Sequence, residues 1–164
     1  QRGLQIGFSG VKSPEIYQAV APHLADKWMI QVKENALTQT ARSQYSPYFP
    51  KAQYIAYGIN MGGVKSRSND SNSSVSLRNI QQPLELVDRI LAFVESDNFL
   101  EPKPESLIEF SLALAIFNPY LSGVITGPRN LSQLKHTFEF SRAIQPDPKV
   151  YARLCAAVPL YGNT

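Results

Sequence analysis

The chain has 164 residues, 43% of them hydrophobic, which is enough for the core of one domain of ordinary size. No apolar run is long enough to span a membrane, and no basic segment followed by an apolar one marks a secretory signal. The net charge is only +3 and the basic residues are scattered, which argues against nucleic-acid binding. The single cysteine, Cys155, cannot form an internal disulfide, so we expect a reducing, cytoplasmic setting.

The first third of the chain predicts short strands joined by helices. Brief β-rich runs bounded by turn residues predict strands over residues 4–8, 28–32 and 53–57. After the first strand, Ser13 is placed to cap a helix that carries Pro14 in its first turn. The apolar stripe of that helix is Ile16, Val20 and Leu24. A short helix is expected within residues 38–48, where Pro47 interrupts the pattern.

The middle of the chain contains one long loop and two helices. Residues 58–82 show little periodicity and many small polar side chains, which is typical of a lid or a binding loop. The next helix has the apolar stripe Leu84, Val87, Leu91 and Val94. The second helix is apolar nearly all round, so it should be largely buried, and Asn118-Pro119 ends it. Its helical spacing is set by Leu107, Phe110, Leu114 and Phe117.

A strand, a tight turn and a helix start follow one another over residues 122–133. Residues 123–126 are β-rich, Gly127-Pro128 ends the strand, and Asn130 is a good N-cap for a helix over residues 131–140. The side chains of that helix expected to face inward are Leu134 and Phe138. A final helix is capped by Asp147-Pro148. It carries Val150, Leu154 and Val158, with Cys155 as a packing residue.

The turn before Asn130 is a candidate anion site. Free amides and the positive end of a helix dipole should point outward there, at the C-terminal edge of the strand. Arg129 adds a planar fork of donors that suits a phosphate. The alternative interpretation is an ordinary turn with an exposed arginine.

The alternation of strands and helices predicts an α/β fold with a parallel sheet. Taken alone, it also fits a small doubly wound sheet. The segment Val-Ile-Thr-Gly-Pro-Arg-Asn-Leu-Ser-Gln-Leu, residues 124–134, resembles the last strand and cofactor loop of the aldo-keto reductases. Residues 3–10, 31–35 and 55–57 resemble the ends of the fifth, sixth and seventh strands of that family, in the same order. The resemblance implies one domain over residues 1–164, a parallel (β/α) half-barrel made of strands five to eight of a TIM-type (β/α)8 barrel.

This resemblance also implies a cofactor, NADP(H), and reduction of a small carbonyl substrate by hydride transfer. It gives Ser9 and Gln31 contacts to the nicotinamide carboxamide and makes Tyr57 the ring that stacks on the nicotinamide. The residues implied at the phosphate and adenosine end are Thr126, Gly127, Arg129, Asn130 and Gln133. Two positions depart from the family pattern: the asparagine common after the serine is Gly10 here, and an asparagine near the adenine is Thr137.

The catalytic tyrosine, lysine, aspartate and histidine of the family lie on its early strands and match nothing in this chain. His23 and His136 do not correspond to the family histidine, so we assign no catalytic or metal-binding residue. Four strands of a barrel would leave two open edges and uncovered apolar faces. The expected partner is therefore the N-terminal half of the barrel or a second chain, and the abrupt start at Gln1 favours a fragment. Two other functions remain open: a non-catalytic nucleotide-binding or regulatory module, and a structural half-barrel without a ligand.

Overall fold

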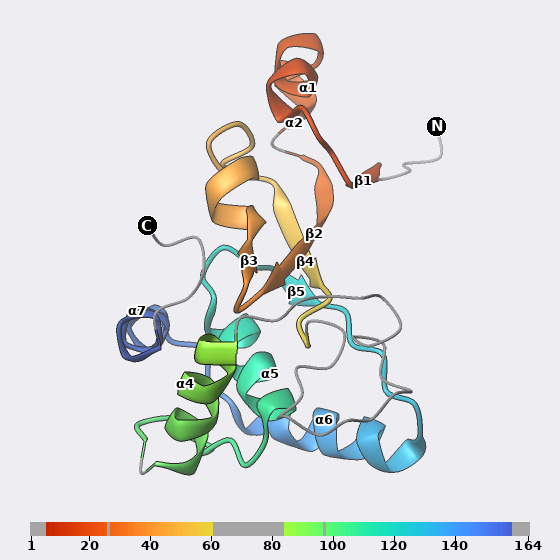
Figure 1. Cartoon of the computed structure of the whole chain (residues 1–164). Coiled ribbons are helices and arrows are strands. Elements are labelled where there is room, and N and C mark those ends of the chain that lie inside the picture. The colour runs from red at the N-terminus through yellow and green to blue at the C-terminus, as the bar shows by residue number, and fades with distance from the viewer. Residues whose placement is uncertain (1–5, 26, 61–83, 97, 159–164) are drawn as a thin grey trace.

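Parallel strands form the centre of the molecule and lie side by side in the order in which they occur in the chain (Figure 1). The computed structural model describes residues 6–25, 27–60, 84–96 and 98–158. Within these residues the parallel strands are β1 (Gly7–Ser9), β2 (Met29–Asn35), β4 (Gln53–Tyr57) and β5 (Gly123–Val124). A two-residue strand, β3 (Thr38–Gln39), pairs antiparallel with the end of β2. The predicted α/β fold with a parallel sheet is confirmed, and it is compatible with a partial (β/α) barrel.

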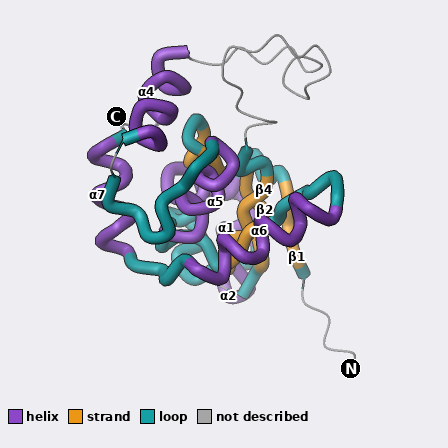
Figure 2. Tube along the Cα trace, turned by 90° about the horizontal axis from the view of Figure 1, so that it is seen from below, coloured by secondary structure: helices purple, strands orange, loops and turns teal. Residues whose placement is uncertain are grey.

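Helices occur between these strands and after the last one. The helices are α1 (Pro14–Val20), α2 (Pro22–Ala25), the π-helix η1 (Ala41–Tyr45), α4 (Leu84–Glu95), α5 (Leu107–Phe117), α6 (Leu131–Ala143) and α7 (Pro148–Ala157). Helix α5 lies between α6 on one side and α4 and α7 on the other (Figures 1 and 2). Helix α1 lies at the opposite end of the sheet from this group (Figure 1).

The two faces of the sheet differ in burial. Along β2 exposed and buried residues alternate, so Gln31 and Lys33 are exposed while Ile30 and Val32 are buried. Residues in register on neighbouring parallel strands point to the same side. The open face of the sheet therefore carries Gly7, Ser9, Met29, Gln31, Lys33, Gln53, Ile55 and Tyr57.

The covered face of the sheet contributes to two apolar clusters. Ala56 packs with α4, α5 and α7 in the larger cluster, which also contains the fully buried Phe110 and Leu154. Ile30 and Tyr54 pack with η1 and Phe49 in the smaller one. Helix α5 is buried along almost its whole length, as its uniformly apolar sequence predicts.

Several element boundaries differ from the prediction. Strand β2 is longer than the predicted strand over residues 28–32. Strand β5 is shorter than the predicted strand over residues 123–126, so Thr126 lies outside it. Residues 38–48 form β3 and the π-helix rather than a short α-helix. The α6 helix continues three residues beyond Phe140, to Ala143. Most of the predicted long loop, residues 61–82, and the start of the first predicted strand, residues 4–5, lie outside the described residues.

The predicted stripe of α1 is wrong because the contact of this helix was placed on the wrong side. Helix α1 packs through Tyr17, whose ring lies 5.6 Å from Phe8 and 6.3 Å from Trp28 between centroids. Its predicted stripe residues Ile16 and Val20 are 57% and 78% exposed. The side chain of the third predicted member of this stripe, Leu24, lies outside the described part.

The stripe on α4 is also displaced. The buried residues of α4 are Leu86, Val87, Ile90 and Val94, whereas the predicted Leu84 is 59% exposed. Across the described residues, no helix is both long and apolar enough to cross a membrane.

Candidate functional site

The two predicted carboxamide-binding residues lie next to each other on the open face. Ser9 ends β1 and is the register partner of Gln31 on β2, and both are exposed. Gly10 follows with φ +67°, a left-handed conformation that glycine adopts freely and asparagine tolerates better than most residues. The chain therefore turns away from the sheet directly after Ser9, which leaves the side chains of Ser9 and Gln31 accessible.

Tyr57 lies at the end of β4, on the same face as Gln31. The residue of β4 directly opposite Gln31 is Ile55, so Tyr57 lies two residues further along the strands. Its register partner on β2 is Lys33, and Tyr57 is half-buried. The backbone after Tyr57 is held by Asn35, whose Nδ2 donates to the Gly58 carbonyl over 3.0 Å. Sequence reasoning gave no role to Lys33, which the register between β2 and β4 places beside the predicted stacking residue.

The predicted anion turn is exposed and its helix cap forms as expected. The Oδ1 of Asn130 accepts from the Gln133 backbone N–H over 2.9 Å, and the Oε1 of Gln133 accepts from the Arg129 N–H over 2.8 Å. This reciprocal pair resembles a capping box, and it uses two amides that a phosphate would otherwise find free. The amides of Leu131 and Ser132 have no partner within the described residues, as in any first helical turn.

Gln133 consequently has a local role that the sequence did not indicate. Its side-chain Oε1 accepts from the Arg129 backbone N–H. Gly127 and the side chain of Arg129 are exposed, and Thr126 is partly buried. The turn therefore offers the Arg129 guanidinium and two helix amides to an anion.

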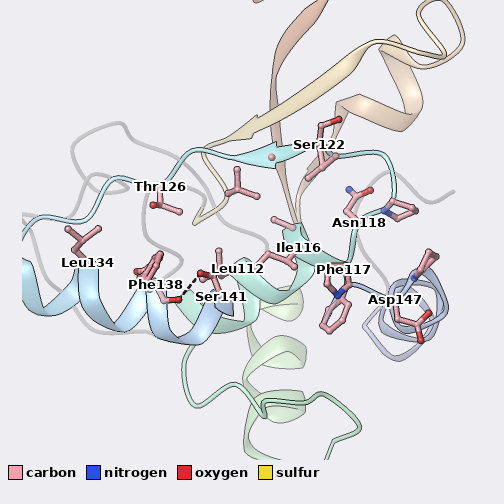
Figure 3. A pocket seen from close by; sticks show the side chains of 18 residues that line it. Leu112, Ile116, Phe117, Asn118, Ser122, Thr126, Leu134, Phe138, Ser141 and Asp147 are labelled. Atoms are coloured by element: carbon pink, nitrogen blue, oxygen red, sulfur yellow. Dashed lines mark hydrogen bonds between the residues drawn. The ribbon is translucent and has the colours of Figure 1, made fainter. Parts of the chain in front are cut away.

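A cavity of about 500 Å³ lies elsewhere, between α5, α6 and the segment that contains β5 (Figure 3). Its walls include Leu112, Ile116, Leu134 and Phe138, and they are mainly apolar. Of the eight predicted site residues, all of which are described, Thr126 alone lines this cavity. The cavity is thus on the helix-covered side of the sheet, whereas Ser9, Gln31 and Tyr57 are on the open face.

Helix α6 explains this cavity and corrects a prediction. Leu134 and Phe138 were expected to face inward, but they are 49% and 57% exposed at the rim of the cavity. The α6 face nearest α5 instead carries His136 and Phe140, one turn apart. His136 Nε2 lies 2.7 Å from Glu109 Oε1 on α5.

A buried polar cluster at the end of β2 was also missed by sequence reasoning. Burial is the main reason why the pKa of Glu34 is raised from 4.5 to about 7. Its carboxyl accepts from the Ala41 N–H and from Asn118 Nδ2, each over 3.1 Å. The burial of Gln39 and Tyr151 beside it could have been anticipated only from the tertiary packing.

No group of three or more His, Cys, Asp or Glu residues in the described chain is arranged to hold a metal ion. We compared the chain with models of known protein families and with curated proteins, and neither comparison found a match.

Proposed function

We propose that this chain is the cofactor-binding half of an NADP(H)-dependent aldo-keto reductase, which reduces aldehydes or ketones by hydride transfer. In this proposal its strands are strands five to eight of a (β/α)8 barrel. The first half of the barrel, or a second chain, supplies the catalytic tyrosine, lysine, aspartate and histidine. The substrate is a small carbonyl compound.

The observation that carries the proposal is the common position of Ser9, Gln31 and Tyr57. Three residues selected by resemblance, from three different strands, lie on one open face: Ser9 and Tyr57 are the last residues of β1 and β4, and Gln31, the third residue of β2, is level with Ser9. Functional groups of parallel (β/α) barrels collect at the C-terminal ends of the strands. The sequential strand order further supports a barrel, because a doubly wound sheet reverses its order at a switch point.

The phosphate end of the cofactor gives the sharpest test. NADPH carries a 2′-phosphate that NADH lacks, and we expect Arg129 to bind it through charge-assisted hydrogen bonds. Such a bond contributes about 1.5–3 kcal/mol, so Arg129→Ala should weaken NADPH binding about tenfold to a hundredfold. Calorimetric titration should show that the same variant leaves NADH affinity unchanged.

The matched control is Arg89→Ala, which removes an exposed arginine from α4, far along the chain from the turn. It should leave the affinity for both nucleotides at the wild-type value. Equal weakening of NADPH and NADH by Arg129→Ala would show that this arginine does not contact the 2′-phosphate. Failure of the wild-type protein to bind NADPH would leave the structural half-barrel as the better interpretation.

A non-catalytic nucleotide-binding or regulatory module of the same fold is the second candidate. It is favoured by one observation: no residue of this chain matches the family's catalytic set. The intact protein, incubated with NADPH and a simple aldehyde, separates the two functions. Oxidation of NADPH supports the reductase, and tight binding without turnover supports the module.

A further inference from the structure

Glu34 and Gln39 are direct neighbours in the hairpin formed by β2 and β3. They are register partners, so their side chains leave the sheet on the same side and lie next to each other. Both are almost completely buried, with 3% and 6% of their surface exposed. Two polar side chains are thus removed from water together.

The Gln39 carboxamide is unpaired in this buried position. Neither its Nε2 nor its Oε1 has a hydrogen-bond partner within the described residues. An unpaired buried polar group costs about 1–3 kcal/mol, so a fold retains one only where something compensates for it. Its neighbours Asn35 and Asn118, by contrast, both form side-chain hydrogen bonds.

A small cavity adjoins this carboxamide. It has a volume of about 10 Å³ and is lined by Glu34, Gln39, Ser111, Asn118 and Tyr151, among others. This volume is close to the minimum that one water molecule requires, and the polar wall offers the two to four partners that a buried water needs. The cavity is therefore matched in size and chemistry to a single water.

We propose that Glu34, Gln39 and the cavity between them form a buried binding site for one proton and one water molecule. The protonated Glu34 carboxyl donates its O–H toward the Gln39 Oε1, through the water, and the Gln39 Nε2 donates back. When the proton leaves to solvent, the carboxylate can only accept, so the water donates to it and the hydrogen bonds between the water and Gln39 rearrange. The site thus links the state of one proton to the arrangement of the β2–β3 hairpin.

Burial, rather than a neighbouring charge, favours the protonated form of Glu34. Its carboxyl accepts hydrogen bonds from neutral groups, among them Ala41 N–H and Asn118 Nδ2; these bonds lower its pKa, but the effect of burial is larger. The ionisable groups on the neighbouring elements are Arg42 of η1 and Tyr151 and Cys155 of α7, and these three groups interact electrostatically. The residues of α5 that line the cavity are uncharged. The raised pKa of Glu34 agrees with this environment.

Segments on three sides are joined at this site. Glu34 binds the first residue of η1 through Ala41 and the end of α5 through Asn118, and Gln39 belongs to β3. A change in the protonation of Glu34 therefore alters contacts of the hairpin, of η1 and of the end of α5 together. This inference is independent of the proposed cofactor and does not require a reductase.

The test is an NMR titration of the protein with labelled glutamate and glutamine side chains. The Gln39 amide protons should shift with the same pH midpoint as the Glu34 carboxyl carbon, and they should show cross-relaxation with a long-lived water. In Glu34→Gln the pH dependence of the Gln39 signals should disappear. Gln53, an exposed glutamine on β4, is the internal control and should show neither effect.

The proposal is overturned if the Gln39 signals stay constant while Glu34 titrates, or if they show no contact with a long-lived water. A Glu34 midpoint near 4.5 would overturn it as well. The wild-type measurements decide these points even where a variant fails to fold.

Discussion

Replacement of Glu34 by glutamine should change how the stability of the protein depends on pH. Burial raises the pKa of this carboxyl from 4.5 to about 7 in the folded state. Below pH 4.5 Glu34 is protonated in both the folded and the unfolded state. Between pH 4.5 and 7 only the folded state keeps the proton, so the stability provided by proton binding is lost progressively as the pH rises. Above pH 7 the loss is complete.

The magnitude follows from the size of the shift. About 2.5 pH units at 1.36 kcal/mol each correspond to a loss on the order of 3 kcal/mol between pH 4.5 and pH 8. Glu34→Gln cannot ionise and avoids this loss. The amide oxygen of the glutamine can still accept from the Ala41 N–H. Its amide nitrogen then faces Asn118 Nδ2, and because both are donors that hydrogen bond is lost. One lost hydrogen bond costs about 1 kcal/mol.

The two effects predict a crossing of the stability curves. Glu34→Gln should be about 1 kcal/mol less stable than the wild type at pH 4.5 and about 2 kcal/mol more stable at pH 8. Urea unfolding followed by circular dichroism at several pH values gives both numbers. Glu95→Gln, which removes an exposed carboxylate at the end of α4, is the control and should show no crossing. A constant difference between Glu34→Gln and wild type at every pH would refute the reasoning.

Two further predictions concern helix contacts. His136→Ala should destabilise the fold by about 1–3 kcal/mol in thermal unfolding, since it leaves the buried Glu109 Oε1 without its 2.7 Å partner, whereas the exposed His23→Ala should have little effect. Ser106→Ala should cost about 1 kcal/mol because the Ser106 Oγ accepts from the Glu109 N–H at the start of α5. Ser13→Ala should cost much less, because Ser13 stands at the N-cap of α1 without a side-chain hydrogen bond; equal losses for the two serines would contradict this.

The order of strands and helices was predictable because it depends on local periodicity. The strand at residues 53–57 and the start of α6 at Leu131 agree with the structure to the residue. Both are marked by residues whose preferences act within a few positions, such as the β-rich run of β4 and the N-cap Asn130. Helix α5 was equally predictable, because a helix that is apolar all round can only be buried.

The orientation of the amphipathic helices was not predictable to the same degree. In α6, Phe138 and Phe140 are both apolar, and the sequence does not say which one meets the core. The contact between His136 and Glu109 joins residues far apart in the chain and lies on the face with the buried Phe140. In α1 the aromatic contact between Tyr17 and Trp28 also joins separate elements. Such choices depend on partners that a periodic pattern does not contain.

The positions of the exposed candidate residues could be predicted from the sequence, but the buried polar cluster around Glu34 could not. The candidate residues lie in strands and turns that local sequence defines. Glu34 is different, because its neighbours Ala41, Asn118 and Tyr151 come from three separate segments. An acidic residue in a strand normally suggests the solvent face, whereas the alternation along β2 places Glu34 on the buried side with Ile30 and Val32.

The alternation within β2 bears on the choice between the two sheet architectures that the sequence allowed. In a doubly wound sheet both faces are covered by helices, so a central strand is apolar on both sides. In β2, a central strand of the described sheet, Gln31 and Lys33 alternate with Ile30 and Val32, and the polar pair is exposed. A second helix layer over this face would bury a lysine and a glutamine without partners, at a cost of several kcal/mol. The polarity of β2 therefore favours a sheet with one open face over a doubly wound sheet.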